Sequence, residues 1–158
     1  MPAGRTFSAE GRIITDRTSG VEVRQLTDYH AHSHHLYFTN NGFRDGGRRL
    51  VIGSHRENRE NLFSVQLETG ELTQLTDFAP GSRPALQGAF LNPARDEAYL
   101  RVGRRMIALD LKTCAQRDLY EAPEGFRIGN CSCTADGKTL CTVLQEDLSG
   151  RINMDMGH

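Results

Sequence analysis

The sequence predicts an all-β protein, namely an incomplete β-propeller built from four-stranded antiparallel blades. The first observation is a repeat, because Gln-Leu-Thr-Asp occurs at residues 25–28 and again, 49 positions later, at 74–77. The second is a pair of related turns at 67–70 and 111–114, which lie 44 positions apart. Both spacings are close to the roughly 40–50 residues of one propeller blade. The third is a pattern of strand, turn and strand that occurs three times, while no segment has the periodicity of a helix.

The first expected strand occupies residues 18–28, where Val21 and Val23 alternate with polar residues. Such alternation places both valines on one face of a strand. No partner strand is expected ahead of it. We therefore interpret it as an orphan strand, of the kind that completes the last blade of a closed propeller.

Two blades and part of a third are expected to follow. Each begins with a hairpin. The turn of this hairpin is Asp-Gly at 45–46 in the first blade and at 136–137 in the partial blade, and it starts with Asn-Pro at 92–93 in the second blade. These residue types favour tight turns. In the first two blades a second hairpin follows, at 61–76 and at 105–120. The expected boundaries are 36–77 for the first blade, 86–120 for the second, 127–145 for the partial blade and 146–158 for a tail.

About two and a half blades cannot close a ring, since a propeller needs at least about four. The open edges lie before Val21 and after Leu144, where strands expose unpaired backbone groups. We therefore expect that the chain can associate with itself through these blade edges.

The charge balance excludes several classes of partner. The 158 residues include 19 Lys and Arg against 20 Asp and Glu, a net charge of −1, so no overall field attracts nucleic acid or an anionic membrane. No apolar run approaches the roughly 20 residues of a membrane-spanning helix, and the N-terminus lacks the apolar region of a signal peptide. The expected location is the cytoplasm, with no nucleic-acid or membrane partner and with the four cysteines as reduced thiols.

Several segments together resemble the N-terminal portion of the oligogalacturonate lyase family. They are Ser-His-His-Leu-Tyr-Phe at 33–38, the Asp-Gly hairpin up to Ile52, the strand pair 62–76 and Gly-Ala-Phe-Leu-Asn-Pro at 88–93. The similarity runs from about residue 21 to about 144, is most specific over 75–111, and covers less than half of a full family member. The Gln-Leu-Thr and Asp-Gly elements alone are also shared by the broader TolB-like propellers.

The resemblance implies a seven-bladed propeller that cleaves short, unsaturated oligogalacturonides by β-elimination in the cytoplasm. A base removes the proton α to the uronate carboxylate, and manganese or another divalent cation neutralises that carboxylate. In the family the metal ligands, a group of His with a Gln, and the base lie in later blades. This chain is therefore expected to hold no catalytic residue, no metal ligand and no cofactor of its own. The alternative interpretation is a non-catalytic TolB-like propeller segment that acts in binding or assembly.

Residues on inner strands face the channel of a propeller, so we expect some of them to contact an acidic oligosaccharide. The amides of Asn40 and Gln87 can donate hydrogen bonds, and guanidinium groups can clamp a carboxylate. His34 matches a His of the family motif, whereas the family usually has Arg and Asn where His35 and Leu36 stand. The candidate substrate-binding residues are His34, His35, Tyr37, Asn40, Arg44, Arg83 and Gln87.

The histidine run at 30–35 has a second interpretation. In an extended segment His30, His32 and His34 project to one side, and imidazoles on one face can bind Zn²⁺, Mn²⁺ or Ni²⁺. We favour an entry loop with solvated or hydrogen-bonded histidines, because no acidic or Cys ligand accompanies the run.

The cysteines Cys131, Cys133 and Cys141 lie on one expected hairpin without the spacing of a zinc or redox site. We expect them to be small buried strand residues, because unpaired Cys is among the most buried residue types.

Overall fold

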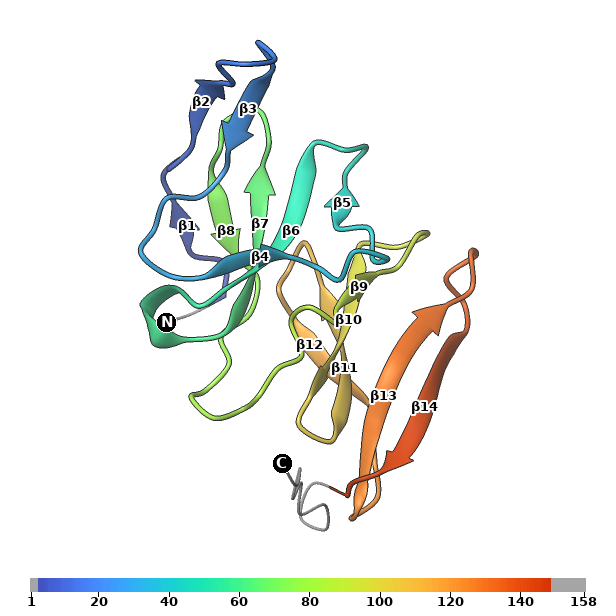
Figure 1. The fold of residues 1–158 in the computed structure, drawn as a ribbon. Coiled ribbons are helices and arrows are strands. Elements are labelled where there is room, and N and C mark those ends of the chain that lie inside the picture. Colours follow the sequence, from blue (N-terminus) through green and yellow to red (C-terminus); the bar gives the residue numbers. More distant parts are fainter. Residues whose placement is uncertain (1–2, 149–158) are drawn as a thin grey trace, which may run out of the picture.

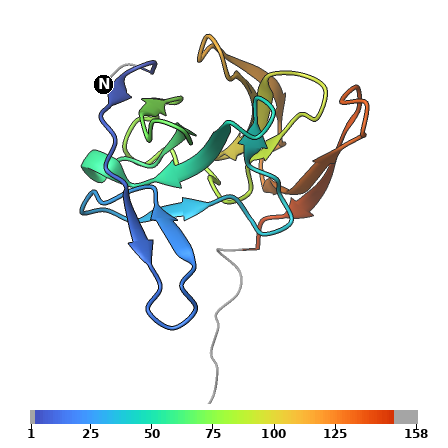
Figure 2. The same cartoon turned by 90° about the horizontal axis from the view of Figure 1, so that it is seen from above.

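Antiparallel strands form successive sheets that pack face to face in the computed structural model, which describes residues 3–148 (Figures 1 and 2). Within those residues the structure contains no α-helix, and only a single 3-10 turn at Arg56–Asn58. No helix among them is long and apolar enough to cross a membrane. The prediction of an all-β protein is confirmed, although residues 149–158 of the expected tail lie outside the described part.

The first blade is centred on β6 and β7, the two strands that are buried on both faces. Alternation along β6 places Leu50 and Ile52 on one face and Val51 on the other, so each face carries its own apolar cluster. The sheet order is β1-β8-β7-β6-β4, and β5 also pairs with β6. The strands are β1 (Thr6–Phe7), β4 (Ser33–His35), β5 (Phe43–Arg44), β6 (Arg49–Ser54), β7 (Asn61–Gln66) and β8 (Leu72–Gln74).

The inner edge of this blade differs from the expectation that residues 37–42, which include the candidates Tyr37 and Asn40, lie on an inner strand. Pairing with β6 is interrupted between β4 and β5. The interruption has a local cause, because the Asn40 amide donates to the carbonyl of Tyr37 at 2.7 Å and the side chain of Asn41 accepts from the Phe43 amide at 2.9 Å. These turn hydrogen bonds compete with a sheet ladder.

The second blade has the expected order of two consecutive hairpins, β9-β10-β11-β12. Its turn after β11 repeats the one after β7, and in both the last residue of the repeated tetrapeptide has positive φ, 80° at Gly70 and 61° at Cys114. Gly70 adopts this backbone conformation without steric cost, whereas Cys114, which has a Cβ, adopts it at a cost. The strands are β9 (Phe90–Leu91), β10 (Glu97–Val102), β11 (Arg105–Asp110) and β12 (Gln116–Glu121).

Two isolated hairpins flank the blades, one at each end of the chain (Figure 1). The C-terminal one, β13 (Phe126–Cys133) and β14 (Leu140–Glu146), corresponds to the expected half blade. The N-terminal one corrects the expectation of an orphan strand, because β3 (Glu22–Gln25) pairs with β2 (Arg12–Thr15) in a regular antiparallel register. The sequence of β2, Arg-Ile-Ile-Thr, does not alternate apolar and polar residues, so this pattern could not indicate the strand.

Three apolar clusters hold the sheets together. The largest fills the space between the two blades, the second joins the second blade to the β13–β14 hairpin through residues such as Tyr99 and Ile128, and the third covers the far face of the first blade. The hairpin β2–β3 projects beyond them in both views (Figures 1 and 2). Val23 on that hairpin is 51% exposed and Val143 on β14 is 55% exposed. Both end hairpins therefore leave apolar surface uncovered.

A buried arginine fastens the N-terminal segment to the first blade. Arg56 is 4% exposed, forms an ion pair with Glu10, and places its guanidinium 4.8 Å from the Phe7 ring centroid and 4.3 Å from that of Tyr29. Burial acts to raise the pKa of Glu10, but hydrogen bonds from Arg56 and two backbone amides outweigh it and lower this pKa. The result is a carboxylate that remains charged beside a stacked guanidinium.

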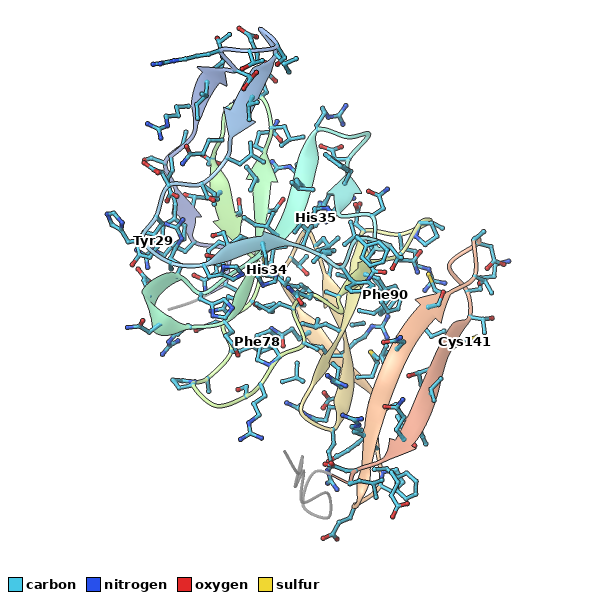
Figure 3. The ribbon with its side chains drawn as sticks, viewed as in Figure 1. Tyr29, His34, His35, Phe78, Phe90 and Cys141 are labelled. Carbon is cyan, nitrogen blue, oxygen red and sulfur yellow. The ribbon has the colours of Figure 1, made fainter. Side chains whose placement is uncertain are left out.

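The cysteine prediction is only partly correct. Cys131 and Cys133 are half-buried, whereas Cys141 is exposed on β14 (Figure 3). All four cysteines are free thiols, and burial raises the pKa of Cys114, Cys131 and Cys133. Cys141 is exposed because it pairs with Ser132 and so lies on the opposite face of the hairpin from Cys131 and Cys133, which pack against the second blade.

Candidate functional site

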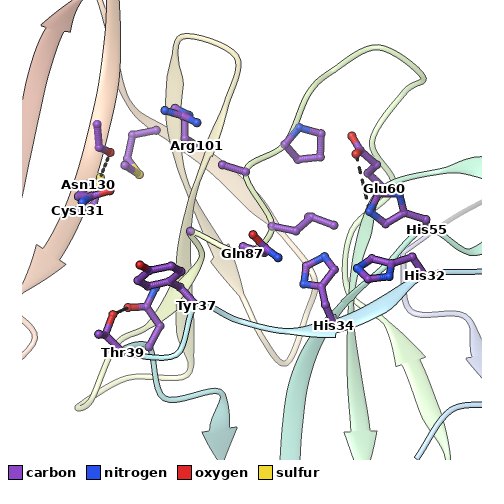
Figure 4. A pocket seen from close by; sticks show the side chains of 17 residues that line it. His32, His34, Tyr37, Thr39, His55, Glu60, Gln87, Arg101, Asn130 and Cys131 are labelled. Atoms are coloured by element: carbon purple, nitrogen blue, oxygen red, sulfur yellow. Dashed lines mark hydrogen bonds and ion pairs between the residues drawn. The ribbon is translucent and has the colours of Figure 1, made fainter.

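A cavity of about 770 Å³ opens between the two blades and the β13–β14 hairpin (Figure 4). Its walls come from β4 and the segment after it, from residues 84–88, from β10 and from residues 129–131. Four of the seven expected substrate-binding residues line it, namely His34, Tyr37, Asn40 and Gln87. The fold thus brings together side chains from residues 34–40 and from residue 87, which are far apart in the sequence.

Backbone hydrogen bonds fix the two segments that carry these residues against each other. The Tyr37 amide donates to the carbonyl of Gln87 at 2.7 Å, and the side-chain amide of Asn40 donates to the carbonyl of Ala89 at 3.0 Å. The ring of Tyr37 is 52% exposed and packs on Phe38 with ring centroids 4.4 Å apart. The cavity therefore has a fixed wall with an accessible aromatic ring.

Arg101 supplies a positive charge that the sequence interpretation missed. It lies on β10, lines the cavity and donates a hydrogen bond to the carbonyl of Ile128 on β13. One of its guanidinium nitrogens is thereby used to hold β13 beside the second blade. The available signal was a charged residue inside the otherwise apolar run 98–102.

Three histidines meet at one end of the cavity. The ring centroids of His32 and His34 lie 5.3 Å apart, those of His32 and His55 5.6 Å, and those of His34 and His55 6.0 Å. His55 comes from the end of β6, where its amide donates to the carbonyl of His32 at 2.9 Å. The set differs from the expected one, because His55 stands beside His32 and His34, whereas His30 is exposed and does not line the cavity. We call His32, His34 and His55 the histidine cluster.

The remaining expected residues lie outside this cavity. The Nδ1 atom of His35 forms a hydrogen bond with the carbonyl of Leu36, and Arg83 is exposed on the segment between the blades. Arg44 lines a second, smaller cavity, where it donates to the carbonyl of Leu111 at 2.9 Å. Burial lowers the pKa of Arg44, and nearby carboxylates oppose this effect. The structure assigns Arg44 to the junction of the two blades.

The described residues do not form a manganese site. As the side chains stand, no group of three His, Cys, Asp or Glu between residues 3 and 148 is placed to hold a metal ion. Imidazole donors such as those of the histidine cluster also bind Mn²⁺ more weakly than Zn²⁺, Cu²⁺ or Ni²⁺. We derive no reaction step through manganese from these residues.

The chain is similar to known oligogalacturonate lyases over most of its length. The family described as oligogalacturonate lyase matches residues 1–147. The oligogalacturonate lyase of Dickeya dadantii is 29% identical over 140 residues, which are 85% of this chain and 35% of that protein. The oligogalacturonide lyase of Pectobacterium atrosepticum is likewise 29% identical over 140 residues, with the same coverage.

Solved structures agree with the sequence comparison. An oligogalacturonate lyase in complex with manganese superposes with a TM-score of 0.78 at 25% identity, over 86% of this chain and 36% of that one. An oligogalacturonate lyase from Vibrio parahaemolyticus gives a TM-score of 0.80 at 21% identity, over 88% of this chain and 37% of that one, and shows the same fold. The chain thus spans about a third of the length of the relatives that it matches. By its sequence and its propeller fold, this chain belongs to the oligogalacturonate lyase family.

Proposed function

We propose that the chain forms part of the oligogalacturonide-binding channel of a lyase that cleaves these acidic sugars by β-elimination. The observation that carries the proposal is the cavity between the blades, where Arg101 lies with His34, Tyr37, Asn40 and Gln87. Four of these five residues were expected from the sequence to bind substrate: His34 by its match to the family motif, and the other three by their expected place on inner strands. Their convergence from two strands and two connecting segments supports a binding role.

The chemistry of the cavity suits an acidic sugar. Each galacturonate unit carries a carboxylate, for which a guanidinium such as that of Arg101 is a strong partner. The amide groups of Asn40 and Gln87 match sugar hydroxyls, and the exposed ring of Tyr37 offers an apolar surface to the C–H face of a pyranose ring. The cavity therefore supplies charge, hydrogen bonds and apolar contact together.

In β-elimination a base removes the proton α to the carboxylate, the bond from C4 to the leaving oxygen breaks, and a C4–C5 double bond forms. The negative charge that develops on the carboxylate side needs a cation beside it. Arg101 can supply part of that charge. The base and the metal ligands of the family lie in later blades by resemblance, so we propose that the 158-residue chain binds the sugar without cleaving it, in the cytoplasm.

Titration calorimetry with digalacturonate tests the binding role. Arg101→Ala should weaken binding about 10- to 100-fold, because a hydrogen bond to a charged group contributes about 1.5–3 kcal/mol. Arg104→Ala is the matched control, since Arg104 lies three residues farther along, in the turn between β10 and β11, and pairs with Glu121 on the surface. Equal affinity of both variants would contradict the proposed site.

Catalysis is tested separately by following ultraviolet absorbance after digalacturonate and Mn²⁺ are added to the isolated chain. We expect no increase from an unsaturated uronate. Sustained turnover would show that the catalytic groups lie within this chain. If there is neither turnover nor sugar binding, the alternative of a non-catalytic TolB-like segment that acts in assembly is favoured.

A further inference from the structure

We propose that the histidine cluster, His32, His34 and His55, binds one divalent transition-metal ion of the Zn²⁺ type at the edge of the cavity. The site is distinct from the manganese site that the family resemblance places in later blades. The argument does not depend on the proposed lyase function, because it uses only the placement of these three side chains.

The backbone already places the three side chains on one face of the first blade. His32 and His34 are two positions apart in an extended segment, so their side chains project to the same side. His55 directly follows β6 and lies opposite His32, which directly precedes β4; the 2.9 Å backbone hydrogen bond joins them and extends the β4–β6 register. Side chains opposite each other on adjacent strands have Cβ atoms about 4.5–5.5 Å apart. Two residues on one strand and one on its neighbour can therefore surround a single ion.

The observed ring separations match those of a three-imidazole site. With Zn–N bonds of about 2.0–2.1 Å in a tetrahedron, three bound imidazoles have ring centroids about 5 Å apart. The separations in the cluster are 5.3, 5.6 and 6.0 Å. The side chains as they stand do not form a complete site within the described residues. To close the site, the His34 and His55 rings must approach each other by roughly 1 Å through small changes of χ1, while rotation about the soft χ2 torsions aims their nitrogens at the ion.

The surroundings of His34 resemble those of a metal-binding histidine. Its Nδ1 atom lies 2.9 Å from the carbonyl of His35. Because a carbonyl only accepts, Nδ1 must carry the proton, which leaves the lone pair on Nε2 free for a metal. Gly53 is directly opposite His34 in the β4–β6 register, and a Cβ at that position would lie only 2.6 Å from Nε2 of His34. The absent side chain makes room for the ring.

Glu60 provides the acidic group that the histidine run itself lacks. Its carboxylate lies 3.9 Å from Nε2 of His55 and also lines the cavity. A carboxylate beside the second nitrogen of a ligating imidazole is the usual outer partner in zinc sites. The opposite side of the cluster opens into the cavity, so a water or a ligand oxygen can take the fourth position.

The donor set selects the metal. Three imidazoles suit Zn²⁺, Cu²⁺ and Ni²⁺, whereas Mn²⁺ and Mg²⁺ favour oxygen ligands. We therefore expect Zn²⁺ to bind far more tightly than Mn²⁺. Zn²⁺ itself is the probe for affinity, and Co²⁺ is the probe for geometry because its visible absorption is intense in a four-coordinate site.

The test uses the untagged 158-residue chain, freed of metal with a chelator. We expect one equivalent of Zn²⁺ to bind with a Kd below about 10 μM, and Co²⁺ to give the intense visible spectrum of a four-coordinate site. His55→Ala and His34→Ala should each weaken Zn²⁺ binding about 100-fold or more, since even the loss of an outer partner costs 10–100-fold. His30→Ala is the matched control, an exposed histidine of the same run, and should bind as the unaltered chain does.

Failure to bind one equivalent of Zn²⁺, or equal affinity of His55→Ala and His30→Ala, would overturn the proposal. Loss of binding in a variant counts only if its far-ultraviolet circular dichroism is unchanged. The Co²⁺ spectrum of the unaltered chain decides the matter where a variant does not fold: a weak six-coordinate spectrum is evidence against the site. No sugar is present in these experiments, so their failure is distinguishable from failure of the proposed oligogalacturonide binding.

Discussion

Thr76, in the second copy of the Gln-Leu-Thr-Asp repeat, should be far more sensitive to mutation than Thr27 in the first. Thr76 is fully buried, accepts a hydrogen bond from the Leu62 amide at 2.9 Å and donates one to Oδ1 of Asn61 at 3.0 Å. Thr27 is half-buried, and its side chain forms no such pair of bonds among the described residues. The substitution of Val for each threonine keeps the side-chain shape and removes only the hydroxyl.

The expected loss can be worked out from these contacts. In Thr76→Val the Leu62 amide loses its partner in a buried position, and leaving such a donor unpaired costs about 1–3 kcal/mol. Oδ1 of Asn61 still accepts a hydrogen bond from the Phe78 amide at 2.9 Å, so the loss of the Thr76 hydroxyl at this oxygen adds little to the destabilisation. We expect the free energy of unfolding to fall by about 2 kcal/mol, in the range of a buried hydrogen-bond defect. Thr27→Val should change it by less than about 0.5 kcal/mol.

Urea unfolding followed by circular dichroism measures the difference, provided that the slope m is the same for all three proteins. Thermal unfolding should show the same order, with a decrease of about 4–8 °C for Thr76→Val at about 2–4 °C per kcal/mol for a chain of this size. If the two variants unfold within about 0.5 kcal/mol of each other, the hydroxyl of Thr76 does not carry the stabilisation that its hydrogen bonds imply.

Three further predictions concern pH, packing and association. The pKa of Glu10 in the folded chain lies below its ordinary value of 4.5, so the ion pair with Arg56 should stabilise the fold fully above that pH and lose this effect as the pH falls through the folded pKa. The difference in free energy of unfolding between the unaltered chain and Glu10→Gln, measured by urea unfolding, should therefore close below pH 4.5. A difference that stays constant with pH would refute the linkage. Gly53→Ala should destabilise the chain by about 1–3 kcal/mol, because the new methyl group meets the ring of His34. An unchanged midpoint of urea unfolding would show that the ring moves aside freely. Leu144→Lys, at a partly exposed position on the open edge strand β14, should shift gel-filtration elution toward the monomer. An unaltered chain that is already monomeric at high concentration would contradict association through open edges.

The paired strands of the blades were predictable because their signals are local. Alternating apolar residues and turn-forming residues occur within a few positions of each other, so the expected ends of β7, β11 and β12 agree with the structure to within about one residue. The repeated Gln-Leu-Thr-Asp also has a local basis. The side chain of Gln74 donates to the carbonyl of Thr76 at 2.7 Å, and that of Gln25 donates to the carbonyl of Thr27 at 2.9 Å.

Elements that depend on distant partners were not predictable in this way. The strand β1 has two residues and is held by its pairing with β8 and by Phe7, whose ring lies 5.9 Å from that of Phe63. The residues of the site follow the same rule. His55 joins His32 only because of the β4–β6 register, and Arg101 reaches the cavity only because the second blade packs beside β13. A one-dimensional pattern contains no information on either placement.

The histidine cluster and the sugar-binding cavity are physically coupled, because His34 belongs to both. An ion held by the cluster would place two positive charges at the rim of the cavity, on the side opposite Arg101 in Figure 4. An oligogalacturonate carries one carboxylate per sugar unit, so two cationic positions can engage successive carboxylates where one cannot. Linkage requires reciprocity: if the ion strengthens binding of the sugar by some factor, the sugar strengthens binding of the ion by the same factor. The cavity would then favour chains of at least two galacturonate units over the single acid, and this preference would require the ion but none of the lyase chemistry.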